Sequence, residues 1–291
     1  MIGAPRILMQ LVVLITNFNG VMPMDLHLCE FFAGCMAVTG VWTRAGYRAA
    51  PFEILLDSSW MDILTPQGFC LAICMALRMR REAFAMLATV CSSWVFVSRS
   101  SSHGTRVMFQ VSASNQKSRS SFKEMVAKMT LILYILESRR CYWCYEQPSS
   151  SMLWSHPRMQ AFFKKVTCFK AFTYMGAYGA STPKPTHLVA SRASVWKFCR
   201  TLPEKEWGEL VTKKTMPDGR VSVTGSSAMK GSQAYTEAFG LATLATWLDE
   251  SDDPEPDLTG IKIPSVWAPL TKDERWEDAK VHECMQYLSG L

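Results

Sequence analysis

Short apolar runs alternate with longer stretches of helical periodicity along this chain of 291 residues. A strand buried on both faces of a parallel sheet is a near-continuous apolar run, whereas a helix repeats its apolar residues every three or four positions. The runs that predict buried strands are 26–32 (LHLCEFF), 51–57 (PFEILLD), 85–90 (AMLATV) and 141–146 (CYWCYE). Their alternation with helical stretches predicts an α/β domain with a mostly parallel sheet.

Four segments between and after these runs predict helices. The stretch 36–47 follows a glycine turn. A helix over about 65–81 begins with a capping threonine and a first-turn proline. A capping box at 121–124 predicts a helix that continues to about residue 139. Residues 234–248 form the last amphipathic pattern, so helices are expected to follow most of the predicted strands.

Two later runs, 166–175 and 186–191, predict a further pair of strands. The segment GAYGASTPKP joins them, and its glycines and prolines are typical of a hairpin or a long turn. We therefore expect residues 25–248 to form one domain whose sheet ends in an antiparallel hairpin. Residues 1–24 are then an N-terminal extension, and residues 249–291, which open with DESDDPEPD, are an acidic linker and a C-terminal tail.

Reactive side chains gather where the predicted strands end. Cys91 follows the third apolar run and precedes a serine-rich loop, and Glu146 closes the fourth run. Gly34 lies in the turn after the first run, and Glu53, within the second run, follows that turn by about 20 residues, where an acid holds a ribose in nucleotide-binding sheets. Because ligands bind outside the carboxyl ends of strands in open parallel sheets, these residues are candidates for one site. A buried free cysteine and a salt-bridged glutamate are the structural alternatives, and the sequence leaves both open.

Charge is distributed unevenly along the chain, whose formal net charge is +6. No acidic residue lies between Glu82 and Glu124 or between Glu146 and Glu204, whereas both stretches contain several lysines and arginines. Basic stretches of this kind suit a phosphate backbone, so nucleic acid is an expected partner. An ordinary solvated surface explains them equally well.

The ten cysteines are scattered through apolar segments and do not have the spacing of a disulfide framework. The single CxxC, Cys141 to Cys144, has no second pair, so we expect no metal site. Reduced thiols fit a nuclear or cytoplasmic location. The apolar run 7–15 is too short to span a bilayer and lacks a signal-peptide cleavage site, so no membrane partner is expected.

Taken in order, the landmarks between Leu26 and Ser191 resemble the DNA cytosine methyltransferases that modify carbon 5 with S-adenosylmethionine. The segment EFFAG at 30–34 is similar to the family's cofactor turn. Val90-Cys91-Ser92 resembles the motif of the catalytic thiol, and Glu146-Gln147-Pro148 the motif of the base-binding glutamate. Further matches are Phe52-Glu53, Met61-Asp62-Ile63, Tyr178-Gly179-Ala180 and, more loosely, Gly231-Ser232-Gln233-Ala234.

The resemblance implies a doubly wound, Rossmann-like methyltransferase sheet and a covalent mechanism. Cys91 would add to carbon 6 of a flipped cytosine, while Glu146 hydrogen-bonds ring nitrogen 3. Glu53 would bind the ribose of the cofactor and Asp62 its adenine amino group. The other implied contacts are Phe32, Ala33, Gly34 and Ile63 to S-adenosylmethionine, and Ser92, Arg99, Arg106 and Lys184 to nucleic acid, with DNA favoured over RNA.

The chain also departs from the family pattern. Met36 and Ala37 replace glycines of the cofactor turn, Val90 replaces the proline before the thiol, and Lys184 is a partial substitute for an arginine pair. About 40 residues separate the hairpin from the closing motif, too few for a target-recognition domain. Three classes stay open: an active methyltransferase, the same fold as a cofactor- or nucleic-acid-binding module without catalysis, and an unrelated α/β protein with structural cysteines.

Overall fold

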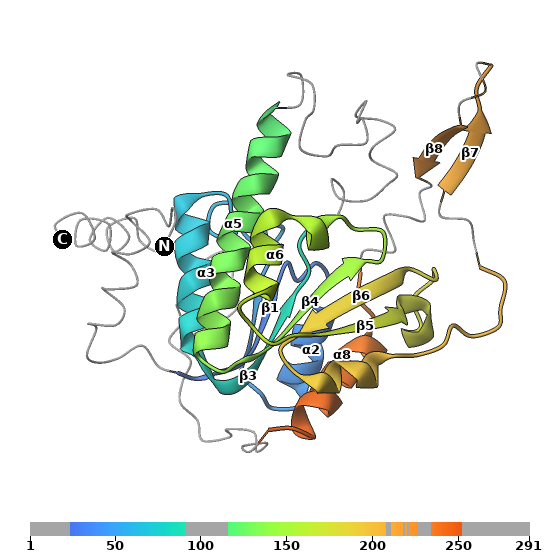
Figure 1. The fold of residues 1–291 in the computed structure, drawn as a ribbon. Coiled ribbons are helices and arrows are strands. Elements are labelled where there is room, and N and C mark those ends of the chain that lie inside the picture. Colours follow the sequence, from blue (N-terminus) through green and yellow to red (C-terminus); the bar gives the residue numbers. More distant parts are fainter. Residues whose placement is uncertain are drawn as a thin grey trace. The chain divides into compact units, whose positions relative to one another are not determined.

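The computed structural model describes residues 24–90, 116–207, 211–217, 219, 221–225 and 234–251. Its main feature is a six-stranded sheet in the order β2-β1-β3-β4-β6-β5 (Figure 1). The strands are β1 Leu26–Phe31, β2 Ala49–Phe52, β3 Met79–Leu87, β4 Tyr142–Pro148, β5 Phe169–Tyr174 and β6 Pro185–Ala190. β1 to β4 run parallel, and β6 is antiparallel to both of its neighbours. The predicted α/β class, the mostly parallel sheet and the late hairpin are confirmed.

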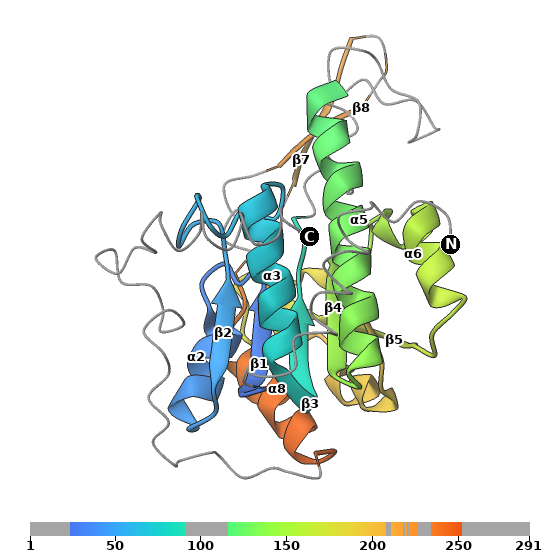
Figure 2. The same cartoon turned by 90° about the vertical axis from the view of Figure 1, so that its left-hand side faces the viewer.

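Helices cover both faces of this sheet (Figures 1 and 2). On one face lie α3 Pro66–Arg78, α5 Gln116–Ser138 and α6 Pro157–Phe163; on the other lie α2 Ala37–Arg44 and α8 Glu237–Leu248. The remaining elements are the 3₁₀ helices η2 Leu153–Ser155, η3 Met175–Tyr178 and η4 Ala193–Phe198 and a second hairpin, β7 Val211–Thr215 with β8 Val221–Gly225. Within the described part of the chain, no helix combines the length and the apolar character that crossing a bilayer requires.

α3 begins where the sequence predicts and ends earlier. The hydroxyl of Thr65 caps it by accepting the amide of Gly68 at 3.0 Å. The prediction that this helix continues to about residue 81 is wrong, because Met79 already pairs with Leu26 of β1. β3 therefore begins with the buried Met79 and continues with the polar residues 80–82, of which Arg81 is exposed. Their polarity resembles that of a helix end, which explains why the sequence pattern misplaces the boundary.

Further boundaries differ from the sequence predictions. β3 ends at Leu87, so the predicted strand over 85–90 stops three residues early. β2 ends at Phe52, and residues 54–56 (Ile-Leu-Leu) form an exposed turn, not the strand that was predicted over 51–57. The strand stops there because Glu53 directs its carboxylate to backbone amides. α5 begins at Gln116, so the predicted capping box at 121–124 lies inside the helix.

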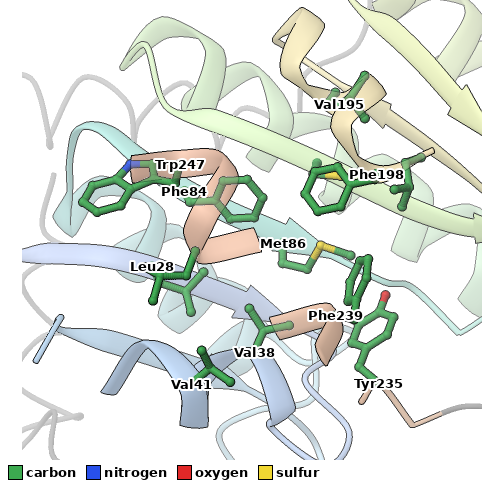
Figure 3. Close-up of a cluster of buried hydrophobic side chains, with 14 of the residues drawn as sticks. Leu28, Val38, Val41, Phe84, Met86, Val195, Phe198, Tyr235, Phe239 and Trp247 are labelled. Carbon is green, nitrogen blue, oxygen red and sulfur yellow. The ribbon is translucent and has the colours of Figure 1, made fainter. Parts of the chain in front are cut away.

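A hydrophobic cluster fills the space between the sheet and the helices α2 and α8 (Figure 3). β1 and β3 contribute Leu28 and Met86, and α8 contributes Trp247. The two helices touch at Gly240, where a Cβ would lie 2.9 Å from the carbonyl oxygen of Ala37. This glycine lets segments about 200 residues apart approach closely, and it brings the residues before α8 to the turn that follows β1.

Candidate functional site

The turn after β1 is strained and is open on one side. Phe32 and Met36 have φ angles of +62° and +58°, in the left-handed region that costs a residue with a Cβ roughly 1–3 kcal/mol. Gly34, with φ +53°, lies between them, and a Cβ on it would meet no atom within 4 Å. The turn therefore leaves open space at the carboxyl end of β1, where ligands bind in sheets of this kind.

Glu53 fixes this turn from the end of β2. Its Oε2 accepts the amide of Gly34 at 2.8 Å, and its Oε1 accepts the amide of Leu55 at 3.1 Å. The amides of Phe32 and Ala33 donate to the last carbonyl of β2. Glu53 is 7% exposed, and each carboxylate oxygen has a second lone pair that can accept a ligand hydroxyl. Four of the predicted cofactor contacts, at 32, 33, 34 and 53, are thus brought together.

Glu30 supplies the cap that α2 lacks at its own N-terminus. Met36 offers no side-chain cap, and instead Oε2 of Glu30 accepts the amide of Thr39 at 2.7 Å and its hydroxyl at 2.6 Å. Oε1 of Glu30 has no hydrogen-bond partner among the described residues. Burial raises the pKa of Glu30 to about 7, against the lowering effect of the two Thr39 hydrogen bonds. A carboxyl group that titrates near neutral pH therefore lies directly beneath the turn.

Asp62 and Ile63 lie in the turn that precedes α3. Oδ1 of Asp62 accepts the amide of Leu64 at 2.9 Å, and its carbonyl accepts the hydroxyl of Thr65 at 2.9 Å. Ile63 is buried. A Cβ on Gly68 would lie 2.0 Å from the carbonyl oxygen of Asp62, so only glycine allows this turn to pack on α3. These hydrogen bonds of Asp62 are local to its turn, and they do not join it to Glu53 or Gly34.

Glu146 sits near the end of β4 with a cation and a hydroxyl beside it. The carboxylate is buried, its Oε2 accepts the hydroxyl of Tyr235 at 3.1 Å, and its Oε1 lies 3.3 Å from Nζ of Lys184. The Lys184 contact is an ion pair that lacks hydrogen-bond geometry. The same ammonium group lies 5.5 Å from the ring centroid of Tyr235. The two predicted site residues Glu146 and Lys184 therefore meet, and the salt-bridge alternative for Glu146 is also realised.

Tyr235 is the site residue that the sequence analysis did not identify. It precedes Thr236, the N-cap of α8, and its carbonyl accepts the thiol of Cys35 at 3.5 Å. Burial, and then the negative charge of Glu146, hold the pKa of Tyr235 well above its ordinary value, so the phenol stays protonated and donates. The available signal was its position directly after the segment 231–234, which resembles the closing motif of the cofactor site.

A buried polar network fixes the chain just before Cys91. Nε2 of Gln147 donates to the carbonyl of Thr89 at 2.7 Å and to its hydroxyl at 3.1 Å. Oε1 of Gln147 accepts the hydroxyl of Ser151 at 2.9 Å, and the hydroxyls of Thr89 and Tyr145 are 2.8 Å apart. The end of β3 is thereby tied to the end of β4. Adjacent strand residues point to opposite faces, so Gln147 serves this network while Glu146 faces Tyr235.

The remaining predicted site residues are Cys91, Ser92, Arg99 and Arg106, and they lie outside the described residues. Their roles stay predictions. Among the residues that are described, no three His, Cys, Asp or Glu side chains form a group that could hold a metal ion. The described site thus consists of an open turn with Glu53, and of Glu146 with Lys184 and Tyr235.

Comparison with known proteins does not assign this chain to a family. No protein-family model matches it, and no curated protein matches it either. A functional proposal therefore depends on the fold, on the geometry of the site and on the resemblance of the motifs.

Proposed function

We propose that this protein is an S-adenosylmethionine-dependent methyltransferase that modifies cytosine in nucleic acid, with DNA as the favoured substrate and the nucleus or the cytoplasm as its location. The observation that carries the proposal is the pairing of Lys184 with Glu146 at the end of β4. The adjacent parallel strand, β3, leads through the fixed Thr89 to Cys91. A thiol and a carboxylate that converge on one base are the pair that cytosine-5 chemistry needs.

The strand order supports a Rossmann-like methyltransferase sheet. Four parallel strands, β2-β1-β3-β4, are followed by the antiparallel hairpin of β6 and β5. This order is compatible with the doubly wound sheet and late antiparallel hairpin that the motif resemblance implies. In such sheets the crevice at the carboxyl ends of the central strands receives the ligand, and that is the edge where Gly34, Glu53 and Glu146 are found.

The residues around the β1 turn fit a nucleoside cofactor. Gly34 borders open space, and Glu53 retains lone pairs that suit the two hydroxyls of a ribose. Phe32 and Ala33 form the wall of the turn, and Asp62 and Ile63 would meet the adenine. When bound, S-adenosylmethionine supplies an electrophilic methyl group. In this proposal, Glu53 and the turn around Gly34 hold the nucleoside part of the cofactor.

On the base side, each residue has a separate task. The Cys91 thiolate adds to carbon 6 of a flipped cytosine, since carbon 5 is a poor nucleophile without this addition. Glu146 acts in its protonated form: its carboxyl O–H donates to ring nitrogen 3, which is an acceptor, and passes the proton to that nitrogen as negative charge develops in the ring. Lys184 and Tyr235 orient the carboxyl group of Glu146. Ser92, Arg99 and Arg106 contact the substrate, the arginines through its phosphates.

One observation favours the second candidate, a module of the same fold that binds cofactor or nucleic acid without catalysis. Glu146 is only 4% exposed, and both of its oxygens already face partners within the chain. A base must displace one of these contacts before it reaches the carboxylate. If Lys184 and Tyr235 keep their contacts with Glu146, the cofactor turn can still bind its ligand, but methyl transfer is lost.

Radiolabelled methyl transfer tests the proposal. The full chain is incubated with S-adenosylmethionine that carries a tritiated methyl group and with cytosine-containing duplex DNA or RNA. We expect transfer by the unsubstituted protein and by Cys199→Ala, whose thiol is exposed on another part of the chain, and none by Cys91→Ala. Absence of transfer together with thermal stabilisation by S-adenosylmethionine favours the binding module. Absence of both overturns the proposal.

A further inference from the structure

The outer face of the β5–β6 hairpin carries an aromatic cluster at the surface. Lys170, Phe172 and Tyr174 alternate along β5, so they share one face. Phe172 pairs with His187 of β6, which places His187 on that face as well. The Phe172 ring centroid lies 5.1 Å from that of Tyr174 and 5.5 Å from that of His187. We call these four residues the β5–β6 aromatic face.

Core packing does not explain this cluster. The core side of β5 is formed by Ala171 and Thr173, which are buried, whereas Phe172 is 42% exposed. Within the described residues β5 is the last strand of its sheet, so no further strand covers it there. An exposed large aromatic side chain that contacts two other rings is a ready surface for stacking.

The charges around the cluster are positive. Lys170, one of the four residues of the face, is exposed, and so are Lys164 and Lys165 in the connection that leads from α6 into β5. Burial, together with the charge of Lys170, lowers the pKa of His187 below its ordinary value, so its ring is neutral at pH 7. No acidic residue occurs between Glu146 and Glu204. The face therefore combines flat rings with cations and is complementary to a phosphate backbone.

We propose that the β5–β6 aromatic face binds single-stranded nucleic acid, with bases stacked on Phe172 and Tyr174 and phosphates near Lys170. Stacking on aromatic side chains beside a positive track is how single strands are bound without sequence preference. The bases of a duplex are already stacked on one another, so a duplex cannot use these rings. The proposal goes beyond the proposed function, because it uses neither Cys91 nor Glu146.

Fluorescence anisotropy with labelled oligo(dT) and oligo(U) tests this binding. The full chain is used without S-adenosylmethionine, and the titration is repeated with Cys91→Ala, so that failure of methyl transfer does not affect the result. We expect Phe172→Ala to weaken binding by about 5- to 150-fold and Phe172→Trp to retain it. Lys170→Gln should reduce the slope of log affinity against log salt by about one.

Trp196 provides the matched control. It is 56% exposed and lies in the same acid-free stretch, but it packs against Phe169, which belongs to the opposite face of β5. Trp196→Ala should therefore leave the affinity unchanged. Equal binding by Phe172→Ala and the unsubstituted protein, equal loss in Trp196→Ala, or equally strong competition by a duplex would overturn the proposal. Circular dichroism and melting confirm that each variant is folded.

Discussion

Gln147 and Thr89 are joined by two hydrogen bonds, from the amide Nε2 of Gln147 to the carbonyl and to the hydroxyl of Thr89. The pair links the ends of two adjacent parallel strands, and Thr89 is two positions before Cys91. Because Gln147 is fully buried and Ser151 holds its other side-chain atom, the amide has one orientation. The strand that leads to the predicted nucleophile is therefore anchored from the strand that carries Glu146.

Replacing Gln147 with Leu should destabilise the fold and abolish methyl transfer. The substitution leaves the buried carbonyl of Thr89 and the hydroxyl of Ser151 without their partner, which costs about 1–3 kcal/mol for each unsatisfied group. Urea unfolding measures the loss. The control is Gln160→Ala: Gln160 is an exposed residue that donates to the carbonyl of Trp154 at 2.5 Å, and its loss should cost less. Equal stability of Gln147→Leu and the unsubstituted protein would contradict the anchoring role.

Removing Lys184 should cost more than removing a lysine from a surface ion pair. Lys184→Ala leaves the Glu146 carboxylate buried without its cation, which destabilises proteins by roughly 3–5 kcal/mol. Lys197 forms a pair with Asp249 at 3.0 Å, with side chains 50% and 64% exposed, and Lys197→Ala should cost less than about 1 kcal/mol. Chemical denaturation at pH 7 compares the two variants. Similar losses would show that the Lys184–Glu146 pair is not effectively buried.

The raised pKa of Glu30 predicts that the free energy of unfolding falls as pH rises. Its pKa in the folded protein is about 7, against an ordinary value of 4.5, so between these pH values the folded state holds a proton that the unfolded chain has released. The linkage relation then lowers the free energy of unfolding as pH rises through this window. A pKa difference of this size corresponds to a change of roughly 3 kcal/mol at most in the free energy of unfolding.

The test compares the unsubstituted protein with Glu30→Gln from pH 4.5 to pH 8. Glutamine keeps an oxygen that accepts both Thr39 hydrogen bonds but cannot ionise. We expect the variant to become more stable than the unsubstituted protein as pH rises, with the difference levelling above about pH 7. A difference that does not change with pH would mean that Glu30 titrates normally in the folded state.

Alanine substitutions at two glycines can distinguish a cofactor-binding role of the β1 turn from simple backbone strain. Gly34 and Gly179 have φ angles of +53° and +85°, and a Cβ on either would meet no atom within 4 Å. Alanine at each should therefore cost a similar amount of stability, roughly 1 kcal/mol from the left-handed conformation. Only Gly34→Ala should reduce the thermal stabilisation by S-adenosylmethionine, because its methyl group enters the proposed cofactor space. Equal thermal stabilisation of the two variants by S-adenosylmethionine would show that the cofactor does not bind at this turn.

The elements and the acids at their ends could be predicted because strand ends are visible in a single sequence. Glu146 closes a predicted apolar run, and the structure places it near the carboxyl end of β4. Glu53 lies inside the predicted run 51–57, and the structure instead places it directly after β2, which ends at Phe52. Glu146 and Lys184 were each predicted as site residues from the resembling motifs, but the ion pair between them was not predicted. The boundary between α3 and β3 could not be predicted, because α3 ends at Arg78 and β3 begins at Met79 with no turn residue between them.

Contacts between distant segments could not be predicted. The hydrogen bond from Tyr235 to Glu146 spans 89 positions, and the contact from Cys35 to the carbonyl of Tyr235 spans 200. These contacts arise only after Gly240 allows α8 to dock on α2. Local patterns along the chain do not predict this docking, so the only sequence signal for Tyr235 was its position after the loosely matching segment 231–234.

Covalent trapping on a fluorinated base tests the central claim most directly. Fluorine at carbon 5 of cytosine blocks the proton loss that releases the enzyme, so a thiol that has added to carbon 6 stays attached after methyl transfer. With an oligonucleotide that contains this base and with S-adenosylmethionine, we predict a complex that survives denaturing electrophoresis and maps to Cys91. Cys199→Ala should form it and Cys91→Ala should not. A folded, cofactor-binding protein that forms no adduct, or forms it equally without Cys91, would contradict the account.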